Sequence, residues 1–273
     1  GHRRPAHAAQ RLGAGLMRST RARSAFTIVE LIVALVVVAT LLGLLFPALS
    51  SVRTGGRQTQ CAGNLRQLIT AAEVYAVTWR EYPLARYYKE VDGRAHTVSW
   101  DWEKVTATRE VVRPGPIWAY TDNPGEIMQC PGYFGPPDPQ GDPYTGYNYN
   151  ASGVGGEVMY VHYGWDHQWD RRGLRPGTAR RPTKTAAFGC GGYRAGSNRY
   201  MRSPVDPAHP PDVRYSGGQA FHYADSTNVA WLDGHVAAVD RKHPGEAATE
   251  DLLDLLGYPD NAFLSNDGSA YDP

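Results

Sequence analysis

One acidic residue, Glu30, interrupts an apolar run that begins at Phe26. No charged residue occurs among the 19 positions from Leu31 to Leu49, and a run of that length can cross a bilayer as a helix. A charge in hydrocarbon costs about 2.5–3.5 kcal/mol on insertion scales, so we expect a positive group to pair with Glu30. If the chain is cut before Phe26, a new α-amino group becomes available for that role.

Three cysteines, Cys61, Cys130 and Cys190, are the next residues with distinctive chemistry. An oxidising compartment allows one disulfide and leaves one thiol, and three buried free thiols are the alternative. The spacings are 69 and 60 residues. Because no Cys-x-x-Cys pair occurs, the sequence disfavours a structural zinc site or haem attachment.

The sequence contains no nucleophile elbow, P-loop, dinucleotide fingerprint or zinc-protease helix. We therefore expect that the protein is not an enzyme. Polar and aromatic residues gather between Val161 and Asp170, in a stretch that is either a loop folded on the core, which we favour, or a surface for carbohydrate or a partner. The residues concerned are His162, Trp165, Asp166, His167 and Trp169.

The predicted membrane helix continues well beyond its apolar run. Pro83 supplies a stop, and a helix from Phe26 to Arg80 would be about 80 Å long. Gly43 and Pro47 are weak helical positions, and Pro47 predicts a kink. Residues at spacings of three and four form one apolar face, namely Cys61, Leu65, Leu68, Ala72, Tyr75 and Trp79.

The region after Pro83 carries the turn and strand signals of a β-rich domain. Asp92-Gly93 predicts a turn between strands through Tyr87-Tyr88 and His96-Thr97-Val98. Residues 182–189 predict a strand that enters the core. The 30 glycines and 20 prolines concentrate in the second half of the chain, which favours many turns and short strands there.

The strongest hairpin signal lies between Asn228 and Ala237, where Asp233-Gly234 separates two stretches of alternating apolar residues. A two-residue turn would place Trp231 opposite Val236. Trp231 would then share a face with Val229, and we expect that face to contact the long helix.

Charge excludes one class of partner. The chain has 28 basic and 27 acidic residues, and six of the arginines lie in residues 1–25, which contain no acid. Without that segment, 22 basic and 27 acidic residues remain, a formal charge of −5. This balance gives no electrostatic footprint for nucleic acid. The arginine-rich segment would lie on the cytoplasmic side of the membrane.

The stretch Ser24-Ala25-Phe26-Thr27-Ile28-Val29-Glu30-Leu31 resembles the N-terminal signature of type IV pilins and type II secretion pseudopilins. In that family a short basic leader precedes a small residue, then Phe-Thr-x-x-Glu-Leu and an apolar helix. Ala25 stands where the family usually has glycine, and Pro47 matches the family's proline. The resemblance implies that a prepilin peptidase cuts between Ala25 and Phe26, and that Phe26 is N-methylated. A leader from Met17 would have the family's typical length, so we expect residues 1–16 to be an upstream extension.

The resemblance implies an α+β, pilin-like fold. A long N-terminal helix, whose first half spans the membrane, would pack on an antiparallel β-sheet domain with loop-rich insertions. The expected organisation is a basic leader over residues 1–25, which is removed, a transmembrane and assembly helix over 26–50, its amphipathic continuation over 51–82, and a periplasmic β-rich domain over 83–273.

The resemblance also assigns assembly roles. Glu30 would pair with the Phe26 amine of a neighbouring subunit, which offsets two buried charges. The segment from Gly43 to Pro47 would either unwind when subunits pack into a filament or form a static kink. The implied partners are further copies of this chain or other pseudopilins, the prepilin peptidase and the bacterial inner membrane. The domain would lie in the periplasm or in an extracellular filament.

A second, C-terminal signature of pseudopilin-like proteins has a histidine, nine residues, then Asp-Gly. His222, Asp233 and Gly234 resemble it, although ten residues intervene here. Some pseudopilins bind calcium through a C-terminal loop, and Asp225 and Asp233 are the candidates for such a site. The alternative, which we favour, is a turn aspartate with satisfied histidines and no cofactor.

The resemblance extends to the cysteines. Cys130-Pro131 occupies a place where proteins of this kind often have Cys-Pro, and Cys61 lies on the helix against which the domain would pack. The implied disulfide joins Cys61 to Cys130, with three buried thiols as the alternative.

These features lead us to expect a structural subunit of a pilus or of a type II secretion-type filament. A membrane-anchored envelope protein with an aromatic-rich domain that binds glycan or a partner is the alternative. A periplasmic enzyme on the same anchor is a third, weaker interpretation.

Overall fold

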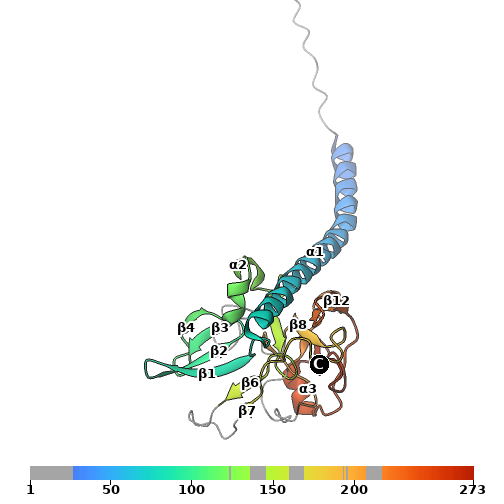
Figure 1. The fold of residues 1–273 in the computed structure, drawn as a ribbon. Coiled ribbons are helices and arrows are strands. Elements are labelled where there is room, and N and C mark those ends of the chain that lie inside the picture. Colours follow the sequence, from blue (N-terminus) through green and yellow to red (C-terminus); the bar gives the residue numbers. More distant parts are fainter. Residues whose placement is uncertain are drawn as a thin grey trace, which may run out of the picture. The chain divides into compact units, whose positions relative to one another are not determined.

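The computed structural model describes residues 27–122, 124–135, 146–159, 169–192, 194, 196–206 and 217–273 (Figure 1). The chain divides into two units, residues 1–49 and 50–273. The predicted cleavage residues Ala25 and Phe26 lie outside the described residues, as does most of the aromatic stretch between Val161 and Asp170.

The longest element is helix α1, Ile28–Trp79, which runs for 52 residues without interruption. It therefore continues through Pro47 and ends at Trp79, close to the predicted end. Arg80 ends it by adopting a φ of 64°, in the left-handed region that does not continue a right-handed helix. The termination thus precedes Pro83, the expected stop.

The second unit is built from β-sheets and short helices, so the predicted α+β class is confirmed. A six-stranded sheet has the order β4-β3-β2-β1-β6-β7, a five-stranded sheet has the order β12-β11-β8-β5-β9, and β10 pairs with β13. Neighbouring strands are antiparallel except β1 with β6 and β5 with β9, which are parallel. The first sheet contains β1 (Arg86–Val91), β2 (Arg94–Ser99), β3 (Trp102–Val105), β4 (Val111–Pro114), β6 (Glu157–Met159) and β7 (Trp169–Asp170).

The remaining elements follow the same chain order. The five-stranded sheet contains β5 (Tyr147–Asn150), β8 (Ala186–Cys190), β9 (Tyr200–Met201), β11 (Thr227–Trp231) and β12 (Val236–Val239), and the small sheet contains β10 (Gln219–Ala220) and β13 (Asn261–Ala262). The short helices are η1 (Pro116–Tyr120), α2 (Pro124–Ile127) and α3 (Glu250–Leu256).

The predicted hairpin at Asp92-Gly93 is confirmed. Strands β1 and β2 pair in antiparallel register from Arg86 opposite Ser99 to Val91 opposite Arg94. Asp92 and Gly93 have φ values of 50° and 71°. Two consecutive positive φ values are the requirement of a type I′ turn, which explains the Asp-Gly pair.

The second predicted hairpin forms, but the prediction of a two-residue turn is wrong. Ala230, not Trp231, lies opposite Val236. The Trp231 N–H donates to the His235 carbonyl at 2.9 Å, so three residues make the loop, and Gly234 has a φ of 88°. This is the other short hairpin that Asp-Gly serves, in which glycine takes the left-handed position after a tight turn.

The shift of one residue places Val236 on the same face as Ala230 instead of Trp231, because side chains alternate along each strand. Ala230 packs in the core cluster that contains the buried residues of α1. Val229 packs in a second cluster with Leu252 and Phe263, and Trp231 lies against that cluster. The prediction that Val229 and Trp231 contact the long helix is therefore wrong.

The apolar face of α1 is buried as its periodicity predicts, up to Ala72. Cys61, Leu65, Leu68 and Ala72 are fully buried with Tyr149 and Phe188 of the five-stranded sheet. Trp79 is the exception at 61% exposure, and its indole N–H donates to the Tyr120 hydroxyl at 2.8 Å. Burial of this face fixes the second half of α1 on the sheet.

Truncation of Leu68 to alanine is expected to lower the free energy of unfolding by about 2–5 kcal/mol, because it opens a cavity under the helix. The matched control is Gln67→Ala on the exposed side of the same turn, expected to change stability by no more than about 0.5 kcal/mol. Denaturant titration of the full chain in detergent, followed by tryptophan fluorescence, measures both. Equal losses in the two variants would contradict the packing of α1 on the sheet.

Candidate functional site

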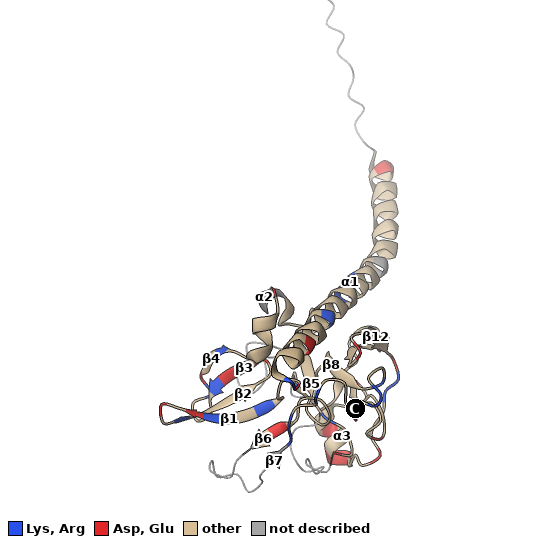
Figure 2. Cartoon of the chain, in the orientation of Figure 1, with Lys and Arg blue, Asp and Glu red and all other residues tan. Residues whose placement is uncertain are grey.

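The first half of α1 presents an uncovered apolar surface. Every side chain described from Ile28 to Leu49 is exposed, including Ile28 at 77% and Phe46 at 66%. The ribbon is acidic at the start of α1 and then uncharged until well into the helix (Figure 2). Among the described residues, α1 is the one helix long and apolar enough to cross a membrane, and a signal sequence has the same properties.

Glu30 has a partner within its own chain. Its carboxylate accepts hydrogen bonds from the Thr27 backbone N–H at 2.8 Å and from the Thr27 hydroxyl at 2.9 Å. The Glu30 backbone N–H in turn donates to the Thr27 hydroxyl oxygen at 3.2 Å. This reciprocal arrangement is a capping box. The sequence pattern Thr-x-x-Glu is typical of a capping box, so this role of Glu30 was present in the sequence beside the charge that it places in lipid.

Gly43 and Pro47 lie within the uninterrupted helix. A side chain at Gly43 would meet nothing within 4 Å, so the position is free of local packing. The unwinding of this segment on assembly and the static kink both stay predictions.

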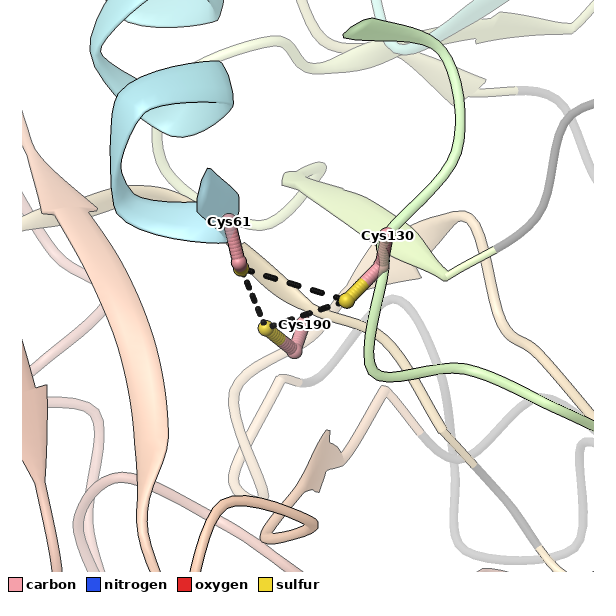
Figure 3. Close-up of side chains that lie close together, drawn as sticks. All are labelled: Cys61, Cys130 and Cys190. Carbon is pink, nitrogen blue, oxygen red and sulfur yellow. Dashed lines mark hydrogen bonds between the residues drawn. The ribbon is translucent and has the colours of Figure 1, made fainter. Parts of the chain in front are cut away.

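The three cysteines converge in the core of the second unit, although they lie far apart in sequence (Figure 3). Cys61 comes from α1, Cys130 from the loop after α2, and Cys190 from the end of β8. The Sγ atoms of Cys61 and Cys190 are 3.3 Å apart, and Cys130 Sγ is 3.9 Å from each of them. All three are buried free thiols. The predicted Cys61–Cys130 disulfide is not formed, and the alternative of three buried thiols describes the structure.

Polar groups surround the cluster of Cys61, Cys130 and Cys190. The Tyr223 hydroxyl lies 3.1 Å from Cys130 Sγ, and His222 Nε2 lies 3.5 Å from the same sulfur. The Asn228 side chain hydrogen-bonds to Cys61. Hydroxyl and amide donors of this kind stabilise sulfur in its anionic form.

The three thiols of the cluster differ in pKa. Burial disfavours ionisation of all three thiols, but hydrogen bonds from Cys130 and Cys190 outweigh it at Cys61 and lower the pKa of that thiol. Burial raises the pKa of Cys130 to about 12 and raises that of Cys190, where the neighbouring sulfurs add to the effect. Burial also lowers the pKa of His222, which favours a neutral imidazole. One sulfur of the three is therefore poised to be a thiolate.

The residues of the C-terminal signature separate in space. His222 lies beside the cysteines, whereas Asp233 is in the β11–β12 turn, with Oδ1 2.5 Å from His235 Nδ1. Asp225 pairs with Lys242 at 2.8 Å, so the two calcium candidates have other partners. Within the described residues, the one group of three or more cysteine, histidine or acidic side chains close enough to share an ion is the cysteine cluster.

Sequence reasoning missed this convergence. Zinc ligands were expected as Cys-x-x-Cys pairs, whereas these three cysteines come together only when the chain folds. Comparison of the chain with family models, curated proteins and solved structures gives no match. The geometry of the described residues therefore carries the functional argument.

Thiol counting separates the two sulfur arrangements. The full chain, isolated without reductant and treated with a chelator, is expected to react negligibly with a thiol reagent while folded, because all three sulfurs are buried. After denaturation it should release three equivalents, and Cys130→Ser should release two. One equivalent from the denatured wild-type chain would instead demonstrate a disulfide.

Proposed function

We propose that this chain is a structural subunit of a pilus or of a type II secretion-type filament, held in the bacterial inner membrane before assembly. The observation that carries the proposal is the uncovered apolar half of α1 with one carboxylate at its start. The same helix continues into the buried face that begins at Cys61. Such a helix gives a subunit both a membrane segment and a continuous chain connection to its domain.

The exposed apolar surface needs a non-aqueous environment. Burying one large aliphatic or aromatic side chain contributes about 1.5–3 kcal/mol, and Leu31, Leu35, Leu44 and Phe46 are all more than half exposed. A contiguous surface of this kind marks contact with membrane or protein. Lipid would cover it in the free subunit, and neighbouring helices would cover it in a filament.

The continuity of α1 favours a retained helix over a cleaved signal sequence. A signal peptidase cuts after the apolar region, which here lies within a continuous helix. The residues that follow, from Cys61 to Ala76, supply part of the domain core. Cleavage before Phe26, by contrast, removes only the basic segment and leaves α1 intact.

Glu30 then has two possible roles. In the single chain its carboxylate caps the helix through Thr27. In a filament it would also neutralise the Phe26 amine of a neighbour, so that neither charge is buried alone. The second role sets the axial register of subunits, and it depends on charge, whereas capping does not.

Three of the described tryptophans give the glycan-binding alternative no support. Trp100, Trp102 and Trp118 are each at most 5% exposed, so they cannot stack on a sugar. Trp100 instead contacts Phe188 edge to face, with ring centroids 5.4 Å apart. These aromatic residues build the core.

Substitutions at Glu30 test the proposal. Glu30→Leu should still insert in the membrane but fail to enter filaments, because an unpaired buried amine costs about 3–5 kcal/mol, roughly a hundredfold or more in association. Glu30→Gln keeps a capping group but loses the charge, and should fail equally. Quantitative immunoblotting of membrane and sheared-filament fractions measures both steps.

Thr40→Leu is the matched control, since it removes a polar side chain from the same apolar segment and its hydroxyl bonds only within its own helix in the described structure. It should assemble normally. Normal assembly of Glu30→Gln would assign Glu30 to capping alone and contradict the pairing. A mature chain that does not begin at Phe26, by mass spectrometry, would contradict the processing on which the pairing rests.

A further inference from the structure

We propose that Cys61, Cys130 and Cys190 form a zinc site, with His222 as the fourth ligand. The site would be structural and would join α1, the loop after α2 and β8. It is independent of the proposed filament function, because it depends only on residues of the second unit.

The spacing of the sulfurs fits a tetrahedral ion. Zinc binds thiolates at about 2.3 Å, which places pairs of sulfurs about 3.8 Å apart, and the observed separations are 3.3, 3.9 and 3.9 Å. The point equidistant from the three Sγ atoms in their plane lies about 2.2 Å from each of them. An ion about 2.3 Å from each sulfur would stand about 0.8 Å out of that plane, as a tetrahedral centre does.

The fourth ligand lies at the edge of the cluster. His222 Nε2 is 3.5 Å from Cys130 Sγ, the distance of about 3.5 Å that a tetrahedral ion imposes between an imidazole nitrogen and a thiolate sulfur. His222 is half-buried, and a rotation of its side chain toward Cys61 and Cys190 completes the set. Three cysteines and one histidine are a common structural zinc set.

Charge favours zinc over a monovalent soft ion. Three thiolates, a neutral imidazole and Zn²⁺ carry a net charge of −1, whereas Cu⁺ on the same ligands would leave −2 in a buried site. Each sulfur that still carries a proton loses its S–H bond as the S–Zn bond forms, and that proton passes to solvent, whereas a sulfur already present as a thiolate binds directly. The Tyr223 hydroxyl beside Cys130 and the Asn228 side chain beside Cys61 then donate to the thiolates, which is the role of outer groups around a metal.

A disulfide explains the arrangement of these side chains less fully than a zinc site does. It would join two sulfurs at about 2.05 Å and leave the third as an isolated thiol. The structure instead brings all three sulfurs together from three separate segments, and places the His222 imidazole 3.5 Å from one of them. Any single disulfide would ignore two of these four groups.

The test uses the full chain in detergent, purified under reducing conditions and then incubated with zinc chloride and desalted. Elemental analysis should give one zinc per chain, and binding should release the protons that the thiols still carry. Cobalt in place of zinc should give the intense visible bands of tetrahedral thiolate coordination. Tyr223→Phe should weaken zinc affinity about tenfold or more without changing the stoichiometry.

The ligand variants are Cys61→Ser, Cys130→Ser, Cys190→Ser and His222→Ala, each expected to lose tight binding and alter the cobalt spectrum. His235→Ala is the matched control, because in the described structure that exposed histidine pairs with Asp233 at the hairpin turn, and it should bind like the wild type. No zinc on the fully reduced wild-type chain would overturn the proposal. So would equal binding by the cysteine variants, or a native disulfide among the three.

Discussion

The packing of the second half of α1 against the five-stranded sheet is the contact on which the rest of the structure depends. Helices are only marginally stable alone in water, and most of their stability in proteins comes from a buried face. Leu65, Leu68 and Ile69 supply that face here. Because α1 is continuous from Ile28, the packed residues belong to the same helix as the apolar half, whose described side chains are all exposed.

The two halves of α1 have the same backbone geometry but different surroundings, and their sequences differ accordingly. From Cys61 onward the helix needs a face that matches the sheet, so apolar residues recur at spacings of three and four. Before Leu49 it is apolar on all sides, as a helix surrounded by lipid or other helices must be. Periodicity and hydrophobic length are local properties of sequence, which is why the helix and most of its buried face could be predicted. The α+β class was what the family resemblance implied.

Two kinds of feature could not be predicted from local sequence: a shift of one residue in strand pairing, and contacts between residues far apart in the chain. Asp-Gly serves both a two-residue turn and a three-residue loop with a left-handed glycine, and local composition does not choose between them at Asp233-Gly234. The observed loop shifts the pairing by one residue, so that Ala230 instead of Trp231 lies opposite Val236. The Asp92-Gly93 hairpin was predicted correctly because its turn is the two-residue type, in which both residues take positive φ.

The cysteine cluster is the clearest case of information held only in tertiary structure. No local spacing indicates that Cys61, Cys130 and Cys190 meet, since the convergence requires α1, the loop after α2 and β8 to pack first. Cys61 and Cys130, the expected disulfide partners, are indeed neighbours, with their Sγ atoms 3.9 Å apart. The expected pairing omitted Cys190, whose sulfur is nearer to Cys61 at 3.3 Å.

The position of Cys61 would give the proposed zinc site a mechanical role. In the described part of α1 it is the first residue in chain order that is fully buried, so it marks where the helix enters the domain core. A force applied along the exposed half of a helix reaches its first buried contact before the others. If the proposed zinc ion joined Cys61 to Cys130 and Cys190, it would resist peeling of α1 from the sheet at that point, whereas the same link near Ala76 would act only after much of the buried face had separated. A cluster at the entry point is therefore where a cross-link protects the greatest length of helix packing.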